Sequence, residues 1–471
     1  MPTSCLRAPS SCMFAACILI AAFFAALACE PHSLAAAEKD AHVVIISVDG
    51  FAAYLLDDPK APVPTIRRLA KQGATAVGGM KVSNPSVTWP NHSSLVTGVR
   101  PEKHGVLANG VVVRGAPDAP VFVDPKRDQR DMIRVPTLWD AAHAAGLTTG
   151  EINWPCTRGS NALDDSFPDV PDSVTHSTPR LIAELVDEGI LTDAKEESFK
   201  TNSTVGRDLI WTEATRHLIR KRMPNLLLVH LLNCDATHHS EGPQTPPGYT
   251  ANAYADMCVA RIVAAIDEAG KRDSTTIFVV ADHGFTATPK ALRPHVVLRK
   301  EGLLKVDPKG KITEARINVF PEGGVGLVYC NNPGTVEEDR KRFIELMKGQ
   351  EGVAGVLQPS EYVEHGLPHP REYAQSPDLV LVAKDGYGVS ASADGETLVT
   401  TQLEGKVAKG THGFLSREKK MNALCIVSGR GIAPGAKVEG IENIDVAPTA
   451  AKLLGLGDFK ADGKPMAVFG K

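Results

Sequence analysis

Runs of apolar, β-branched residues, each ending near an acidic residue or a glycine, constrain the fold of this chain more than any other feature. Helical patterns separate these runs, as in Thr65 to Gln72, which follows a proline and is closed by Gly73. Continuous apolar runs that alternate with helices are typical of a sheet buried on both faces. The sequence therefore predicts an α/β fold in which helices flank both faces of a central, mostly parallel sheet. The predicted strands are His42 to Asp49, Leu226 to Asp235, Thr275 to Asp282, Val325 to Tyr329, Asp378 to Ala383 and Ala423 to Ser428.

The stretch from about 286 to 405 differs from its flanks. It is richer in turns and in charge, and the chain returns to the main pattern near His412. We interpret residues 286–405 as a smaller subdomain that is inserted into one domain spanning residues 38–471.

Residues 1–37 are predicted to form a signal peptide. Arg7 precedes an apolar run from Met13 to Ala28, and small residues follow it. The run is shorter than the roughly 20 residues of a membrane span, and small residues suited to cleavage lie near Ala28 and at 35–37. Cys29, directly after the run, loosely resembles a lipoprotein processing site. We expect an exported protein, periplasmic or secreted, without a transmembrane span, and the alternative is a lipoprotein tethered to the membrane by lipid at Cys29.

Charge and cysteine content exclude several classes of protein. The 471 residues include 55 acidic and 51 basic side chains, a formal net charge of −4, and 43% are hydrophobic. This balance argues against a disordered chain and against a polymeric nucleic acid as partner. Five cysteines follow the leader and none forms a CxxC pair, so we expect neither a zinc ribbon nor a dense disulfide framework. The oligomeric state leaves no signal in the sequence.

Three of the predicted strands end in aspartate, at Asp49, Asp235 and Asp282. Ligands of open α/β sheets bind outside the carboxyl ends of the strands, so these carboxylates are candidates for one site. His283 follows Asp282 directly, and His239 lies four residues after Asp235, on the same face of one helical turn. The pair Asp282-His283 taken alone is explained equally well by capping of a turn and by a hydrogen bond to a carbonyl group, and a single D-x-x-x-H pattern such as Asp235 and His239 is common by chance.

A further histidine, His412, lies in the sequence Thr411-His412-Gly413-Phe414. Together with the three aspartates and their histidines it completes a set of carboxylates and imidazoles, which catalytic zinc sites use as ligands. The set is too large for one ion and sufficient for two. The sequence thus predicts a site for two metal ions at the carboxyl ends of the strands.

Thr88 is the candidate nucleophile. It lies just before Pro90, which we expect to begin a helix, and free backbone N–H groups at a helix start favour an anion. Thr88 could instead be only a cap, and nearby serines offer rival hydroxyl groups at positions 86, 93 and 94. Asn109 follows a turn-rich stretch, and its amide could donate to a phosphoryl oxygen or simply complete a turn.

The combination of these motifs resembles the alkaline phosphatase superfamily, and most of all its type I phosphodiesterase/nucleotide pyrophosphatase family. The residues that carry the resemblance are VVIISVDG, VTWPNHSSLVTGVRPEKHG, DATHHSEGP, ADHGF and THGF, in that order, and IDVAPTAAKLLGL from Ile444 to Leu456 is similar to the terminal helix of the family. The resemblance covers nearly all of residues 38–471 and implies an alkaline phosphatase-like catalytic domain.

The resemblance also implies roles for individual residues. Thr88 would be the covalent nucleophile, forming a phosphothreonine intermediate, and Asn109 would contact the phosphoryl group. Two Zn²⁺ ions would be held, one by Asp235, His239 and His412, the other by Asp49, Asp282, His283 and the oxygen of Thr88.

Two further positions, His238 and Arg158, have two interpretations each. His238 stands where relatives commonly have glycine; it could compete with His239 as a ligand or lie solvated at the rim of the pocket. The stretch NWPCTRG, Asn153 to Gly159, is similar to the WPG region of the diesterase family and carries one base, Arg158. Arg158 could bind a terminal phosphate or close a surface turn.

The favoured function is cleavage of phosphodiester or pyrophosphate bonds in small, nucleotide-type phosphate esters. A phosphomonoester carries one more negative charge, which an apolar pocket with few cations would leave unpaired. No CxPSR-like block of sulfatases occurs in the chain, and phosphoglycerate mutases of this superfamily use serine where this chain has Thr88. A phosphomonoesterase is the second hypothesis, and a zinc-stabilised binding protein without turnover is the third. The leaving group is not revealed by the sequence.

Overall fold

The computed structural model describes residues 39–401 and 409–470. The predicted signal peptide, 1–37, with Cys29, lies outside these residues. Within them no helix combines the length and the apolar character that a membrane crossing needs.

An eight-stranded sheet forms the centre of the fold, in the order β21-β2-β20-β8-β1-β7-β5-β6. Pairing is parallel from β8 through β6, and β20 is antiparallel to both of its neighbours. This arrangement confirms the predicted α/β class with a mostly parallel sheet. The strands of the sheet are β1 (His42–Val48), β2 (Ala74–Ala76), β5 (Thr149–Pro155), β6 (Asp165–Asp169), β7 (Leu226–Leu231), β8 (Thr275–Val280), β20 (Cys425–Gly429) and β21 (Ala436–Val438).

The centre of the sheet consists of β8, β1 and β7, which are neighbours and run in the same direction. Every residue of these three strands is buried, as the continuous apolar runs predicted. Because parallel strands end at one edge, the residues that follow β8, β1 and β7 come together there. This edge carries the predicted metal ligands.

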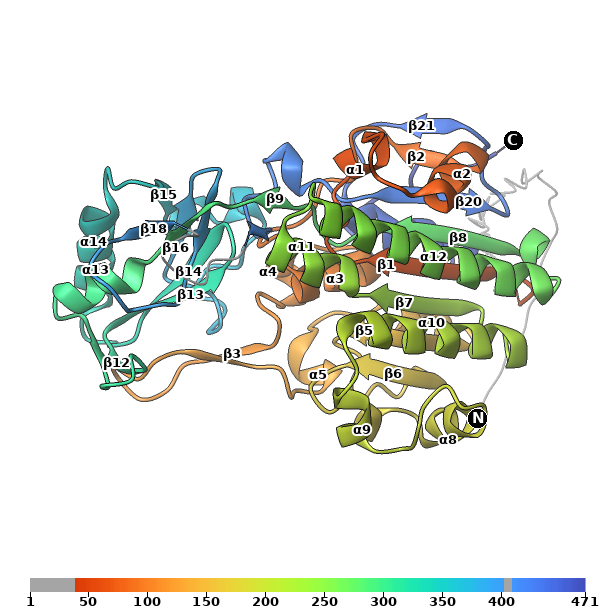
Figure 1. Ribbon diagram of the computed structural model, residues 1–471, viewed down its shortest axis with the longest axis horizontal. Helices are drawn as coiled ribbons and strands as arrows, with labels where there is room; N and C mark the ends of the chain where they lie inside the picture. Colours follow the sequence, from red (N-terminus) through yellow and green to blue (C-terminus); the bar gives the residue numbers. More distant parts are fainter. Residues whose placement is uncertain (1–38, 402–408, 471) are drawn as a thin grey trace, which may run out of the picture. The chain divides into compact units, whose positions relative to one another are not determined.

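Helices cover the sheet on both faces. In one group α10 packs against α12, and α10 contacts β5 and β7, while α2 packs on β20. Figure 1 shows α10 and α12 running along the strands, in front of the sheet. The other group places α3 and α6 on β5, with α15 packed on both. The helices of this domain are α1 (Tyr54–Asp57), α2 (Pro64–Gln72), α3 (Thr88–Thr97), α4 (Pro101–His104), α5 (Gln129–Met132), α6 (Leu138–Ala144), α7 (Ser173–His176), α8 (Pro179–Asp187), α9 (Glu196–Lys200), α10 (Thr204–Lys221), α11 (Asn233–Glu241), α12 (Pro246–Glu268) and α15 (Val446–Leu453).

Two local expectations were wrong. Asp235 does not end a strand: β7 stops at Leu231, because the Asp208 carboxylate accepts hydrogen bonds from the Leu232 and Asn233 N–H groups, at 2.8 and 3.0 Å, and so begins α11. The helix predicted to begin at Pro90 begins instead at Thr88. Proline is tolerated in the third helical position because the N–H groups of the first turn have no partner within the helix.

Residues 286–401 contribute strands to sheets other than the central one. A four-stranded sheet has the order β13-β14-β16-β15, a three-stranded one the order β17-β10-β18, and β11 pairs with β12. The short pair β9–β19 leads into and out of this region, and the hairpin β3–β4 lies outside the central sheet too. The boundaries 286–405 of an inserted subdomain stay a prediction. The elements are β3 (Val111–Val113), β4 (Phe122–Asp124), β9 (Thr286–Ala287), β10 (Lys290–Leu292), α13 (Pro294–Lys300), β11 (Leu304–Val306), β12 (Ile312–Ala315), β13 (Ile317–Glu322), β14 (Val325–Cys330), α14 (Val336–Met347), β15 (Val353–Leu357), β16 (Leu379–Ala383), β17 (Tyr387–Val389), β18 (Val399–Thr401) and β19 (Gly410–Thr411).

Candidate metal centre and substrate pocket

The predicted ligands meet at the carboxyl edge of β8, β1 and β7. Asp49 follows β1, Asp282 and His283 follow β8, and Asp235 lies in the first turn of α11, after β7. His412 follows β19 directly. The backbone ties two of these segments together, because the Gly50 N–H donates to Asp282 Oδ1 at 3.1 Å.

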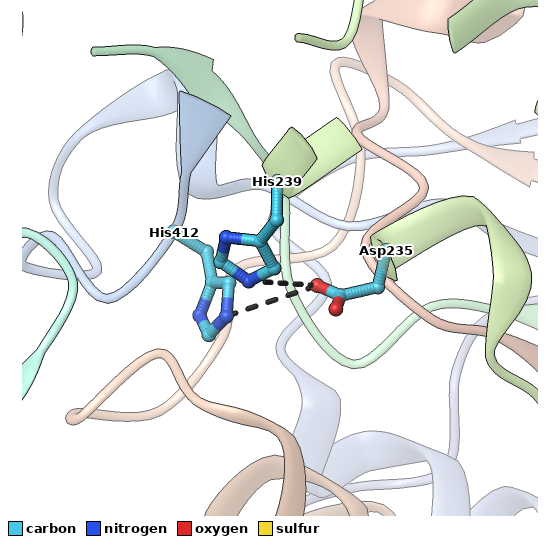
Figure 2. Close-up of side chains that lie close together, drawn as sticks. All are labelled: Asp235, His239 and His412. Carbon is cyan, nitrogen blue, oxygen red and sulfur yellow. Dashed lines mark ion pairs between the residues drawn. The ribbon is translucent and has the colours of Figure 1, made fainter. Parts of the chain in front are cut away.

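Asp235, His239 and His412 form the first ligand group. Asp235 Oδ1 lies 3.5 Å from His239 Nε2 and 3.7 Å from His412 Nε2 (Figure 2). Asp235 and His239 project from one turn of α11, as their spacing predicted. The three ligand atoms lie within 4.8 Å of one another, which is the arrangement of donors around one ion.

Asp49, Asp282 and His283 form the second ligand group, and all three are fully buried. His283 Nε2 lies 3.4 Å from Asp49 Oδ1 and 3.2 Å from Asp282 Oδ2. Asp235 is close to this group too, because one ligand atom each of Asp235, Asp49 and His283 lie within 4.8 Å of one another. The two ligand groups are therefore adjacent. The imidazoles of His283 and His412 stack with ring centroids 3.7 Å apart.

Backbone carbonyl groups orient all three imidazoles in the same way. The Nδ1 atoms of His239, His283 and His412 lie 3.1, 3.1 and 2.9 Å from the carbonyl oxygens of Gly410, Gly284 and Ser86. An Nδ1–H that donates to a carbonyl leaves the lone pair on Nε2 free for a metal ion. In each of the three rings Nε2 is the atom that faces the carboxylates.

Glycine follows two of these histidines for a steric reason. A Cβ at Gly413, where φ is +77°, would lie 1.6 Å from the Glu322 carbonyl oxygen, and one at Gly284 would lie 2.0 Å from the Lys420 carbonyl oxygen. Neither position can accept a side chain without a shift of backbone. The repeated His-Gly pairs thus allow the chain to pass close to its neighbours directly after a ligand.

The side chains of the two ligand groups are suited to binding cations, because they do not satisfy one another by hydrogen bonds. Four of their atoms are buried without a hydrogen-bond partner, although carboxylates and imidazoles lie within 4 Å: Asp49 Oδ1, Asp235 Oδ1, Asp282 Oδ2 and His283 Nε2. Burial, together with the neighbouring carboxylates, raises the pKa values of Asp49 and Asp282 well above their usual range. Burial also lowers the pKa of His412 to about 4 and that of His283 well below its usual value. Ionised carboxylates beside neutral imidazoles would need a bound cation to balance their charge, and this donor set suits Zn²⁺.

Two histidines that the sequence analysis did not identify support the second ligand group. His230, in β7, places Nε2 2.9 Å from Asp49 Oδ2 and Nδ1 2.9 Å from the Asn153 carbonyl. His92, in α3, places Nδ1 3.5 Å from Asp282 Oδ2. Both are fully buried. His230 lies within an apolar run, where a histidine has no signal that separates it from a core residue, whereas His92 lies among polar residues of α3.

His92 connects the nucleophile candidate to the ligands. Its Nδ1 lies 2.9 Å from the Thr88 carbonyl oxygen, and its Nε2 lies 2.9 Å from the Ser47 hydroxyl oxygen in β1. Thr88 is therefore fixed at the start of α3 by the same ring that lies next to Asp282. The rival hydroxyl groups are engaged elsewhere, those of Ser86, Ser93 and Ser94 donating to the Phe414 carbonyl, to Cys156 Sγ and to the Pro90 carbonyl.

Asn109 is exposed and lies beside the first turn of α3. Its Oδ1 accepts a hydrogen bond from the Trp89 N–H at 2.9 Å, which leaves its amide N–H groups free to donate. Asn109 and Trp89 line a pocket of about 320 Å³, with Asn153 and Asp169 nearby and with residues of α9 and α10 on another side. Trp89 Nε1 donates to Asp169 Oδ2 at 3.0 Å, which fixes the indole ring against this pocket.

Arg158 and His238 have different surroundings from the ligands. Arg158 Nε lies 3.0 Å from Asp128 Oδ1 and Nη1 donates to the Lys126 carbonyl, and Arg158 is not among the described residues that line the pocket of Asn109. His238 is buried against Phe285, with its Nε2 3.7 Å from Cys234 Sγ, and burial lowers its pKa to about 4. His239, and not His238, belongs to the group around Asp235.

The sheet topology, the adjacent ligand groups and the threonine at the start of α3 define a member of the alkaline phosphatase superfamily. The sequence profile of the type I phosphodiesterase/nucleotide pyrophosphatase family matches residues 43–415. The chain belongs to this family, as the sequence motifs predicted.

Curated relatives and solved structures agree with this assignment. The chain is 23% identical over 421 residues to human ectonucleotide pyrophosphatase/phosphodiesterase family member 1 and 21% identical over 432 residues to a venom phosphodiesterase of Crotalus durissus collilineatus. These matches cover 88% and 89% of this chain but only 40% and 45% of the relatives, so the chain spans less than half of their length. The structure of murine ectonucleotide pyrophosphatase/phosphodiesterase 5 is similar in fold, with a TM-score of 0.65 at 18% identity, covering 90% of this chain and 100% of the murine one. An inactive variant of that murine protein was solved in complex with AMP.

Proposed function

We propose that this protein is an exported, zinc-dependent hydrolase that cleaves phosphodiester or pyrophosphate bonds in nucleotide-type substrates, with Thr88 as nucleophile. The observation that carries the proposal is the pair of adjacent carboxylate–imidazole groups, joined to the first turn of α3 through His92. Membership of the phosphodiesterase family and the names of its relatives support the same reaction class.

The proposed cofactor is a pair of Zn²⁺ ions. Bound zinc would lower the pKa of a coordinated hydroxyl group and neutralise charge on the phosphoryl group and on the leaving oxygen. The residues that would hold one ion are Asp235, His239 and His412, and those that would hold the other are Asp49, Asp282, His283 and Thr88.

The reaction would consist of two displacements at phosphorus, with Thr88 as the nucleophile of the first. In the first, Thr88 Oγ1 loses its proton to solvent and forms a bond to phosphorus as the bond between phosphorus and the leaving group breaks, and the leaving group departs with the electron pair. In the second, a water oxygen attacks phosphorus, the bond to Thr88 Oγ1 breaks, and Thr88 recovers a proton. Two inversions give net retention of configuration at phosphorus.

Asn109 and the start of α3 would bind the phosphoryl group between these steps. The Asn109 amide N–H groups are free because the Trp89 N–H occupies Oδ1, so they can donate to a non-bridging oxygen. The dipole of α3, whose positive end lies at Thr88, adds further positive potential for an anion. Both features are preorganised, since the loop and the helix hold each other by that hydrogen bond.

A diester is favoured over a monoester as substrate. Arg158, the base suggested to bind a terminal phosphate, already contacts the Asp128 carboxylate and the Lys126 carbonyl. A guanidinium group engaged in this way would have to break those contacts to bind a dianionic phosphate. Phosphomonoester cleavage remains the second candidate and a non-catalytic, zinc-stabilised binding protein the third.

Hydrolysis of the p-nitrophenyl ester of thymidine 5′-monophosphate, compared with p-nitrophenyl phosphate, tests the proposal. We expect the zinc-loaded protein to prefer the thymidine diester and Thr88→Ala to abolish turnover of both compounds. Thr97→Ala is the matched control, because Thr97 lies on the same helix and its hydroxyl donates to the Ser93 carbonyl. No activity of the zinc-loaded protein on either compound would favour the binding protein, and preference for the monoester would reverse the ranking.

Export is the second part of the proposal. The mature protein is expected to begin after Ala28 or within residues 35–38, in the periplasm or outside the cell, and lipid at Cys29 would tether it to a membrane. N-terminal sequencing of the exported protein tests this, with an intact Met1 as the contradicting result.

A further inference from the structure

The pocket beside Asn109 has one wall built from α9 and the beginning of α10. We call this the α9–α10 wall and define it by Phe199, Lys200, Arg207 and Trp211, all of which line the pocket together with Asn109 and Trp89. Two aromatic rings of the wall are close together, with the centroids of Phe199 and Trp211 6.0 Å apart. Nothing in the reaction proposed above uses this wall.

Arg207 is the unusual residue of the wall. Its Nη2 donates to the Lys200 carbonyl at 3.1 Å, and its guanidinium carbon lies 5.5 Å from the centre of the Phe199 ring. Its Nε is buried and has no hydrogen-bond partner. Within the part of the chain that the structure describes, no carboxylate oxygen pairs with Arg207, so its charge is not balanced by an ion pair.

The other cation of the pocket has a carboxylate partner, and the two acids of the pocket accept hydrogen bonds from neutral N–H groups. Lys200 pairs with Asp172 at 2.9 Å. Asp169 accepts from Trp89 Nε1, and Glu196 accepts from the Val174 N–H at 2.8 Å. Of the two cations that line the pocket, Lys200 thus has a carboxylate partner and Arg207 has none among the described residues.

We propose that Arg207 is a specificity-determining residue that binds a second phosphate group, carried by the part of the substrate that enters this pocket. The inference rests on the proposed function, since Asn109 in the same pocket is assigned there to the phosphoryl group that reacts. A substrate held at Asn109 and lying in a pocket of about 320 Å³ meets the α9–α10 wall with its remaining atoms. A planar guanidinium group with free N–H donors matches a phosphate in a bidentate manner, and the Phe199 ring beneath it limits its rotation.

The alternative role of Arg207 is packing alone. An arginine over an aromatic ring stabilises that ring by cation–π attraction and covers it with its aliphatic stem, without any ligand. Packing predicts that substitution lowers stability and affects all substrates alike. Binding of a second phosphate predicts an effect confined to substrates that carry one.

A matched pair of substrates separates the two roles. Thymidine 5′-(p-nitrophenyl phosphate) and the same compound with a 3′-phosphate differ only in the second anion. For the zinc-loaded wild type we expect kcat/KM to be about 10- to 100-fold higher for the 3′-phosphorylated compound, the range of a charge-assisted hydrogen bond. Arg207→Gln should remove this preference and leave kcat/KM for the unphosphorylated diester within about twofold, and Arg207→Lys should retain part of the preference.

Arg220→Gln is the control, because Arg220 lies on the same helix and pairs with Glu188, outside the lining of the pocket. It should leave both values unchanged. Equal kcat/KM for the two compounds in the wild type would overturn the proposal. An equal loss of kcat/KM on both compounds in Arg207→Gln would also overturn it, because packing alone predicts that result. A loss of p-nitrophenyl phosphate hydrolysis in Arg207→Gln would overturn it too, because it would place Arg207 on the reacting phosphate.

Binding measurements keep the test independent of turnover. Isothermal titration of zinc-loaded protein carrying Thr88→Ala should show thymidine 3′,5′-bisphosphate binding about 10- to 100-fold more tightly than thymidine 5′-monophosphate, and addition of Arg207→Gln should equalise the two affinities. If neither thymidine ester is hydrolysed, the proposed function fails and this titration still decides the role of Arg207. Equal affinities in the presence of Arg207 would overturn the proposal.

Discussion

Removal of zinc is expected to destabilise the protein, and more at pH 8 than at pH 5. The second ligand group buries Asp49 and Asp282 without enough donors, and their pKa values in the folded state are raised. A carboxyl group with a raised folded-state pKa contributes stability below its unfolded-state value of about 4, and this contribution is lost as the pH rises through the folded-state pKa. The metal-free protein therefore becomes less stable as the pH rises, whereas bound cations favour exactly the ionised form that predominates at pH 8.

The size of the effect follows from mass action. One ion that binds the folded state at a free concentration 1,000 times its dissociation constant adds about 4 kcal/mol to the free energy of unfolding. At an unfolding entropy of about 2.1 cal/mol/K per residue, the 425 residues that the structure describes need about 0.9 kcal/mol for each degree of Tm. Two ions should thus raise Tm by about 9 °C at pH 8, and by no more than about half of that at pH 5, where protons compete for the ligands.

Scanning calorimetry with zinc and with a chelator, at both pH values, measures the shift. His239→Gln should keep about half of the zinc-dependent shift, because only the first ligand group contains His239. His143→Gln, at an exposed histidine of α6, is the control and should keep all of it. An unchanged Tm on zinc removal at pH 8, or a larger shift at pH 5, would refute the reasoning.

Four further outcomes are expected. Asn109→Ala should lower kcat for the thymidine diester about 100-fold or more, as removal of a donor to a developing anion does, and steady-state kinetics at saturating substrate would show it. Arg158→Gln should change kcat/KM for the same diester less than about threefold; a 100-fold loss would place Arg158 on the substrate. Glu322→Gln should stabilise the protein by about 3 kcal/mol at pH 7 and by little at pH 4. Burial raises the pKa of this carboxyl from 4.5 to about 8, so the stability that the protonated carboxyl contributes is lost as the pH rises between these two values. Calorimetry at the two pH values checks this. His238→Asn should leave two zinc ions per chain by metal analysis and His239→Asn should not; equal losses would contradict the assignment of His239 as the ligand.

Much of the fold could be predicted because strands that are buried on both faces consist of continuous apolar residues. The strands β1, β7 and β8 are buried on both faces, so their sequences are continuous apolar runs, and their neighbours in the chain are amphipathic helices. The same logic predicted that the candidate ligands Asp49 and Asp282 lie together, since carboxylates that follow such runs lie at the carboxyl edge of the sheet. The spacing of Asp235 and His239 predicted their common face on α11.

Other features depend on contacts between distant segments and left no local signal. Asp208 begins α11 by accepting hydrogen bonds from residues 24 and 25 positions later, so the end of β7 could not be found from its own sequence. His92 and His230 lie near the candidate ligands in the interior, and those contacts are made only by the tertiary fold. The α9–α10 wall joins Asn109 only through the tertiary fold, because about 90 residues separate them.

Crystals of the zinc-loaded protein, measured at the zinc absorption edge, test the central claim most directly. We expect two anomalous peaks per chain, one among Asp235, His239 and His412 and one among Asp49, Asp282 and His283, with Thr88 Oγ1 at coordinating distance from the second, about 2.0–2.2 Å. A single peak, or a Thr88 oxygen remote from both ions, would contradict the account.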